Sequence, residues 1–268
     1  VAEAAAKGEV RDIAGAKVGI IDVPSFYTAG RRDEERSTSA DLRRILSDFS
    51  SQGVDIAVVD LRSNGGGSLS QAIDTTGLFI EKGPVVQVKN RDGSIETYDD
   101  PDPGIAWDKP VVVLTSIFSA SASEIFAGAL QDYDRGLIVG APATHGKGTV
   151  QELMDLSSML GQLTGDRAKG RFGGALKFTT SQFYRVNGRS TQVEGVLADV
   201  VVPSLTDDLE YREGDLPGAL PHDTIPAARF KRWRGAADTE ALQAASTARV
   251  KASAAFAVLA ELKALRDA

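Results

Sequence analysis

The sequence contains no cysteine and only two histidines, His145 and His222, among its 268 residues. The absence of cysteine excludes disulfides, thiolate nucleophiles and zinc–sulfur sites. With two histidines, we do not expect a metal site built from several histidines. No run approaches the ~18 consecutive apolar residues of a membrane-spanning helix, so we expect no membrane span.

The chain is also poor in positive charge. Its 30 basic and 37 acidic residues give a net charge of −7, whereas proteins that bind a phosphate backbone usually carry a basic patch. Nucleic acid is therefore not an expected partner. Val1 is not an initiator methionine, and the first ten residues lack the basic and apolar regions of a signal peptide. We expect the chain to be a fragment or processed form of a longer protein, with any export signal outside it.

Short apolar runs rich in β-branched residues alternate with segments of helical periodicity. Such runs predict buried strands, and their alternation with helices predicts an α/β layered core with a largely parallel central sheet. The expected strands are 17–24, 54–62, 110–116 and 136–140. The expected helices begin with a capping box at Thr38 and Asp41, near Leu69, and near Ser121. Hairpins are expected at residues 83–98 and, turning at Asn187-Gly188, at residues 175–192.

Composition divides the chain into four segments. Residues 1–16 are expected to lead in from an upstream module, and residues 17–203 form the compact core. Residues 204–237 shift to proline, glycine and acidic residues, which predicts a loosely packed extension. The alanine-rich residues 238–268 are expected to form the helical start of a C-terminal domain.

Three unusual loops follow three of the predicted strands: "SNGGGS" after 54–62, "FSASAS" after 110–116 and "THGKG" after 136–140. In open α/β sheets, ligands gather outside the carboxyl ends of the strands. Glycines, serines and a lysine at one sheet edge therefore make a candidate site.

Each loop also has a purely structural interpretation. Ser121 and Glu124 have capping-box spacing, although a helix N-terminus is also a good place for a nucleophile, since its N–H groups stabilise an oxyanion. The glycines 65–67 can simply form a turn, or can bring a backbone N–H close to a substrate carbonyl. Lys147 can be a surface residue in a glycine turn.

Two other site types find little support in the sequence. A phosphate loop fails at two positions, because five residues separate Gly140 from Gly146 and Gly148 replaces the required Ser or Thr. A triad of a serine, His145 and one of Asp60, Asp132 or Asp134 has no support from spacing, and no G-x-S-x-G elbow is present.

Four motifs, in the same order, closely resemble the tail-specific, or C-terminal-processing, proteases. They are "DLRSNGGGSLSQAIDTTGLFI", "IFSASASEIFAGALQDY", "VGAPATHGKGTVQE" and "SQFYRVNGRSTQVEGV". That family comprises serine peptidases with a Ser/Lys dyad and a crotonase/ClpP-like core. Two positions depart from its pattern: one extra residue precedes the lysine, and Ala198 replaces a proline.

The resemblance assigns roles to five residues. Ser121 resembles the nucleophile and Lys147 the general base. Gln151, one helical turn beyond the lysine, resembles the residue that hydrogen-bonds and orients it. The N–H groups of Gly67 and Ala122 resemble the oxyanion hole.

The same resemblance implies a serine endopeptidase that needs no cofactor and cleaves proteins near apolar C-terminal tails, in the periplasm or another exported compartment. Such a base must be neutral, while free lysine titrates near pH 10.4, so Lys147 needs a lowered pKa. No acidic residue adjoins it in "THGKGTVQE". Two alternatives stay open: an acyl-CoA-type enzyme on the same core, and a non-catalytic fragment, because family members usually carry a PDZ domain and none is found here.

Overall fold

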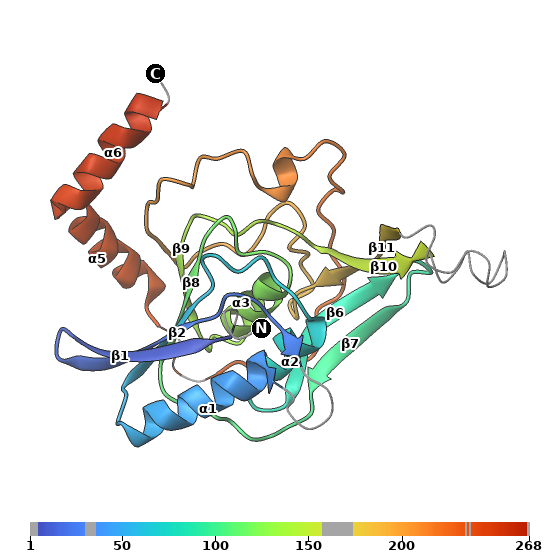
Figure 1. The fold of residues 1–268 in the computed structure, drawn as a ribbon, viewed down its shortest axis with the longest axis horizontal. Coiled ribbons are helices and arrows are strands. Elements are labelled where there is room, and N and C mark those ends of the chain that lie inside the picture. Colours follow the sequence, from blue (N-terminus) through green and yellow to red (C-terminus); the bar gives the residue numbers. More distant parts are fainter. Residues whose placement is uncertain (1–4, 30–35, 157–173, 234, 236, 267–268) are drawn as a thin grey trace.

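The computed structural model describes residues 5–29, 36–156, 174–233, 235 and 237–266. A six-stranded sheet with the order β1-β2-β5-β8-β9-β12 forms its centre (Figure 1). Its strands are β1 (Lys7–Ile13), β2 (Ala16–Asp22), β5 (Ile56–Asp60), β8 (Val111–Thr115), β9 (Leu137–Gly140) and β12 (Val200–Val201). All neighbours pair in parallel except β1 and β2. The predicted α/β fold with a largely parallel sheet is confirmed.

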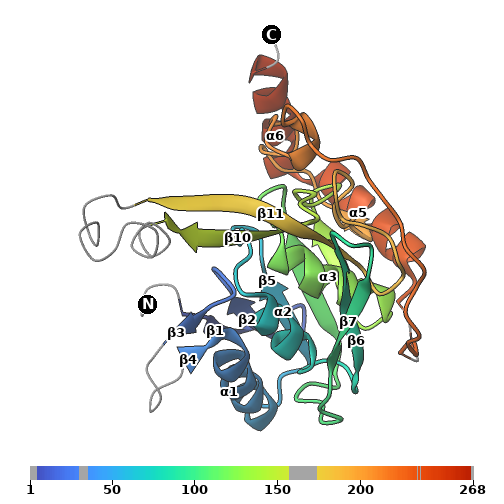
Figure 2. The same cartoon turned by 90° about the vertical axis from the view of Figure 1, so that its right-hand side faces the viewer.

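A second, antiparallel sheet has the order β10-β11-β6-β7. Its strands are β6 (Gly83–Asn90), β7 (Ile95–Asp100), β10 (Thr149–Asp155) and β11 (Ala175–Tyr184), and β10 and β11 project from the body of the protein (Figure 2). The expected hairpin at 83–98 is confirmed. At 175–192 the turn at Asn187-Gly188 is confirmed by an antiparallel bridge between Tyr184 and Ser190, but the predicted pairing of the whole segment is wrong, because β11 pairs with β10 and β6. A small sheet joins β3 (Thr28–Ala29) to β4 (Arg36–Ser37).

Helices α1 (Thr38–Ser51), α2 (Leu69–Thr76) and α3 (Ala122–Asp132) pack against these sheets. Helix α3 contacts β9 of the first sheet and β6 of the second, so it lies between them. The apolar face predicted for α1 is buried, but its N-cap is Ser37, one residue earlier than expected; the Ser37 hydroxyl accepts from the Ala40 N–H. The core positions of the predicted helices were thus visible in the periodicity, while the cap was not.

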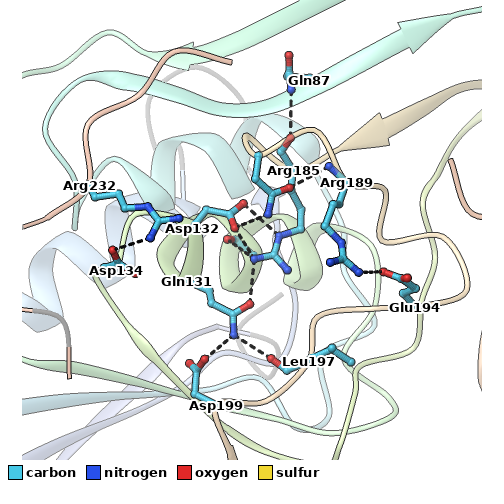
Figure 3. Close-up of polar contacts among 12 residues, drawn as sticks. Gln87, Gln131, Asp132, Asp134, Arg185, Arg189, Glu194, Leu197, Asp199 and Arg232 are labelled. Carbon is cyan, nitrogen blue, oxygen red and sulfur yellow. Dashed lines mark hydrogen bonds and ion pairs between the residues drawn. The ribbon is translucent and has the colours of Figure 1, made fainter. Parts of the chain in front are cut away.

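The C-terminal end of α3 is fixed by a polar network (Figure 3). Asp132 is buried and accepts from Arg185 at 2.5 Å and from Asn187 at 2.7 Å. Gln131 donates to Leu197 O and to Asp199 Oδ1, both at 2.8 Å. Helix α3 is therefore held at this end by two later segments of the chain.

The two ends of the described chain are more structured than composition indicated. Residues 7–13, expected to be a lead-in, form the edge strand β1. The predicted C-terminal helical segment is two helices, α5 (Thr239–Ala252) and α6 (Ala254–Arg266), because Ser253 has extended backbone angles. Residues 1–4 and 267–268 of these predicted segments lie outside the described part. None of the described helices is both long and apolar enough to cross a membrane.

Candidate active site

The loops after β5, β8 and β9 meet at one end of the parallel sheet, as predicted. There they surround a pocket of about 300 Å³ that also receives side chains from β10 and β11. All five residues singled out in the sequence line this pocket: Gly67, Ser121, Ala122, Lys147 and Gln151. Residues from three separate loops therefore converge on one cavity.

Ser121 stands apart from the two serines beside it. Its φ of 57° and ψ of −113° are a strained conformation for a residue with a side chain, costing of order 1–3 kcal/mol, and such strain clusters at active sites. Ser119 and Ser123 are fully buried and donate to Leu61 O and Asn64 O, both at 2.8 Å. Those two serines thus have buried structural roles, whereas Ser121 is both the N-cap of α3, as its spacing to Glu124 predicts, and part of the pocket lining.

The glycine loop approaches Ser121 too closely for any other residue at Gly66. A Cβ built there would lie 2.7 Å from Ala120 O and 2.9 Å from Ser121 Cβ, and the φ of +107° favours glycine as well. Asn64, which is fully buried, fixes this loop by donating to Val23 O and accepting from Gly66 N–H, both at 2.8 Å.

Two backbone N–H groups beside Ser121 are free. In the described part of the chain, neither the Gly67 N–H nor the Ala122 N–H donates a hydrogen bond to the protein. Flanking bonds hold the glycine in place, since Phe26 N–H donates to Gly66 O at 2.9 Å and Ser68 N–H donates to Phe26 O at 2.8 Å. Unpaired donors at a pocket wall are available to bind a developing negative charge.

Lys147 is half-buried, and its Nζ donates to Thr149 O at 2.7 Å. Burial, aided by the nearby charge of Lys177, lowers the pKa of this amine below its ordinary value. Glu213 and Glu124, which the fold brings near, act in the opposite direction on this pKa. The sequence around Lys147 therefore does not show the two carboxylates that lie near it in the fold, yet the net effect on the pKa of Lys147 is a lowering.

Gln151 lines the pocket but does not lie on a helix. It is an exposed residue of strand β10, next to a register shift between Val150 and Gln151. The expected helical turn between Lys147 and Gln151 is wrong, because pairing with β11 extends this segment. Among the described residues, no hydrogen bond joins the Gln151 side chain to Lys147.

Glu124 is the residue that the sequence interpretation undervalued. Its fully buried carboxylate accepts from Ser121 N–H and Gly146 N–H at 2.7 Å, from Thr144 Oγ1 at 2.5 Å and from Lys147 N–H at 3.0 Å. Burial raises the pKa of this carboxyl to about 7 against the effect of those bonds. The capping spacing identified Glu124, but only the fold shows that it joins the serine to the lysine loop.

Two residues of the expected loose extension clamp the same loop. Arg212 donates to Thr144 O at 2.9 Å, to Val193 O at 3.0 Å and to Glu194 O at 2.7 Å. Glu213 N–H donates to His145 O at 2.9 Å. The prediction of loose packing is wrong here, and no local signal in the sequence relates these residues to the lysine.

The alternative triad is not assembled. His145 faces Glu213, with 3.6 Å between Nε2 and Oε2. The carboxylates considered as its partner bind arginines instead: Asp60 binds Arg62, Asp132 binds Arg185, and Asp134 binds Arg232. Within the described ranges, no group of three or more histidines and carboxylates is arranged to hold a metal ion.

Comparison with protein families gives two matches along the chain. Peptidase family S41 matches residues 17–202, and the C-terminal domain of tail specific protease matches residues 206–268. The two matches meet close to the boundary expected at residue 203.

Individual proteins agree with these matches. The chain is 39% identical over 230 residues to the tail-specific protease of Haemophilus influenzae, covering 86% of this chain and 31% of that protein. It is 40% identical over 147 residues to a carboxyl-terminal-processing protease of Synechocystis, covering 55% of this chain and 32% of that one. The photosystem II D1 C-terminal processing protease superposes with a TM-score of 0.59 at 27% identity, covering 77% and 50% of the two chains. The chain thus spans about a third of the length of these two curated relatives.

The raised pKa of Glu124 predicts a pH-dependent stability. An unfolded glutamate titrates near 4.3, so between this value and about 7 the native state binds more protons than the unfolded state. Stability should therefore fall as pH rises through this window, with a slope approaching 1.4 kcal/mol per pH unit. Urea unfolding of wild type and Glu124→Gln between pH 5 and 8 measures this contribution as the difference in slope. Equal slopes would contradict it, and exposed Glu240→Gln is the control.

Removing the clamp should loosen the lysine loop. Arg212→Ala leaves three carbonyls without their charged donor, and each such bond contributes about 1.5–3 kcal/mol. Hydrogen exchange of peptides covering residues 144–148 and 193–195 should quicken roughly tenfold or more. Arg91→Ala, at the exposed turn between β6 and β7, is the control. Unchanged hydrogen-exchange protection of these peptides in Arg212→Ala would contradict a stabilising role of Arg212 in the loop.

Proposed function

The chain belongs to peptidase family S41, and we propose that it is a serine endopeptidase that cleaves proteins near their C-terminal tails with Ser121 as nucleophile and Lys147 as general base. The observation that carries this proposal is the pocket itself. One cavity brings together a strained serine, an amine of lowered pKa and two free N–H donors. No other chemistry considered for this sequence needs all four.

The lysine acts as a base because its charged form is poorly stabilised. The Nζ has a carbonyl partner, Thr149 O, and no carboxylate bonded to it among the described residues. Burial of an ammonium without a bonded carboxylate favours the neutral amine, which can accept the proton of Ser121 Oγ. Gln151, on the pocket wall, is the residue we assign to orienting this amine once substrate is bound.

The proposed reaction has the following steps. Ser121 Oγ attacks the scissile carbonyl as its proton passes to Lys147 Nζ. The oxyanion receives hydrogen bonds from Gly67 N–H and Ala122 N–H; losing one such donor typically costs about 3–4 kcal/mol in barrier. Lys147 returns the proton to the leaving amine, and an acyl-enzyme remains. Lys147 Nζ then activates the water molecule that hydrolyses the acyl-enzyme.

The pocket lining supports a preference for apolar side chains. Apart from the proposed machinery and Lys177, its walls include Leu69, Ile125, Val150 and Phe183. An apolar residue next to the scissile bond would bury surface here, which contributes roughly 25 cal/mol per Å². This agrees with the expectation that substrates are proteins with apolar tails. The expected periplasmic or otherwise exported location is part of the same proposal.

The acyl-CoA alternative is not favoured. It would use paired N–H groups on a related core but would not need Ser121 and Lys147 in one pocket. The family match to peptidases also points away from it.

Substitution of either dyad residue tests the proposal. Ser121→Ala and Lys147→Ala should each lower kcat for an unfolded protein with an apolar C-terminus by roughly 10⁴-fold or more. Wild type should also gain the mass of the acyl group at Ser121 when mixed with an activated peptide ester. Ser94→Ala and Lys251→Ala, both exposed and far along the chain from the pocket residues, are the controls. Cleavage that survives either dyad substitution, or no cleavage by wild type, contradicts the proposal.

The charge of Lys177 should set the pH profile. Since Lys177 lowers the pKa of Lys147, Lys177→Gln should raise this pKa and move the ascending limb of kcat/KM to higher pH. Lys177→Arg keeps the charge and should leave the limb in place. If the ascending limb of kcat/KM stays at the same pH in Lys177→Gln, the limb reports a group other than Lys147, which contradicts the prediction.

A further inference from the structure

A second cavity, of about 570 Å³, shares no lining residue with the catalytic pocket. It lies where β6 begins and α3 ends, and residues 229–233 form its outer wall. The catalytic pocket is near the other end of β6, where Ser181 pairs with Asn90. At about 3.4 Å per residue, the two ends of this strand are roughly 24 Å apart.

The charge of this cavity opposes that of the chain. Its lining has five basic residues and one acidic residue in a protein with a net charge of −7. The acidic residue is Glu81; the basic residues are Lys82, Arg135, Arg229, Lys231 and Arg232. Basic residues gathered on one surface of an acidic protein attract an anionic partner.

Most of these cations lack a partner of their own. Arg232 pairs with Asp134 at 3.3 Å. In the described part of the chain, Lys82, Arg229 and Lys231 form neither an ion pair nor a side-chain hydrogen bond. Arg135 is 5% exposed and donates only to carbonyl oxygens, those of Phe79, Trp107 and Lys109. The charge of Asp108 acts on Arg135, but among the described residues no carboxylate is hydrogen-bonded to this guanidinium, so it can still attract an incoming anion.

Hydrogen bonds and ring packing fix the segment that forms the outer wall of the cavity. Trp233 N–H donates to Tyr133 O at 2.7 Å, and Ala228 N–H donates to Val186 O at 2.8 Å, so the segment is anchored at both ends. Phe230 packs on Tyr133 with 5.1 Å between ring centroids. Arg135 stacks on Trp233 at 4.8 Å. The cationic side chains therefore surround an apolar floor that is already formed.

We propose that this cavity binds an acidic peptide segment of a partner protein, with an apolar side chain on the floor and flanking Asp or Glu side chains on the surrounding cations. Carboxylates spaced along an extended chain match cations that are distributed around the cavity. A nucleotide would need an open aromatic face for its base, whereas Trp233 is already stacked with Arg135 and Phe230 with Tyr133. The site is remote from the serine, so it recruits a partner and does not cleave it.

Charge reversal tests the proposal. The probe is a short fluorescein-labelled peptide with Glu and Asp around a central Phe, and its binding is followed by fluorescence anisotropy. All proteins carry Ser121→Ala so that the probe stays intact. Lys82→Glu with Lys231→Glu should weaken binding roughly tenfold or more, because two charge contacts become repulsive. Lys7→Glu with Arg91→Glu changes the net charge equally at two exposed sites outside the cavity and should change affinity by less than about twofold.

Further arms separate the ligand classes. A probe with Gln and Asn in place of the acids should bind at least roughly tenfold more weakly to the parent protein. Equal binding of the two probes, equal loss in both charge-reversed proteins, or no binding of the acidic probe overturns the proposal. So does a cavity-dependent interaction with ATP or with phosphatidylglycerol vesicles that is tighter than that with the peptide.

Discussion

A single buried carboxylate organises the site. Glu124 stands at the first turn of α3 and accepts the N–H of Ser121 through one oxygen and the N–H of Gly146 through the other. It thereby joins the start of a helix to a loop that follows a different strand. Burial makes the charged form of this carboxyl costly, and the four donors around it offset only part of that cost, so its pKa stays raised. A backbone bond, His145 N–H to Ser119 O at 3.0 Å, is a second link between the serine segment and the lysine loop.

Much of this arrangement could be predicted from sequence because it depends on local patterns. Buried strands, the helical face of α1 and three loops after three parallel strands follow from periodicity, and parallel strands bring such loops to one edge. What failed depends on long-range pairing. Strand β11 pairs with β6 and with β10, a strand that the sequence did not predict, and the pairing with β10 extends the chain around Gln151. The clamp by Arg212 acts on carbonyl oxygens, which every residue carries, so no side-chain pattern could reveal it.

Arg212 and Glu213 also connect the two regions of the chain that match different families. Residues 206–268 match a separate C-terminal domain family, yet Arg212 and Glu213 from this region hold the backbone of the lysine loop. Farther on, residues 229–233 cross the end of α3 and supply most of the cations of the second cavity. The same extension thus stabilises the proposed catalytic site and forms a surface of opposite charge to the rest of the chain. Its composition predicts loose packing because the region has little regular secondary structure, yet Arg212 and Glu213 make specific hydrogen bonds to the lysine loop.

The central claim is that Lys147 presents a neutral amine to Ser121 in the pocket that both residues line. Its most direct test is NMR titration of the lysine side chains in protein labelled at Cε, with the Lys147 signal assigned from a Lys147→Arg variant. The account predicts that this signal titrates well below pH 10.4, the ordinary pKa of a lysine side chain. A Lys147 signal that titrates together with the exposed lysines would contradict the account.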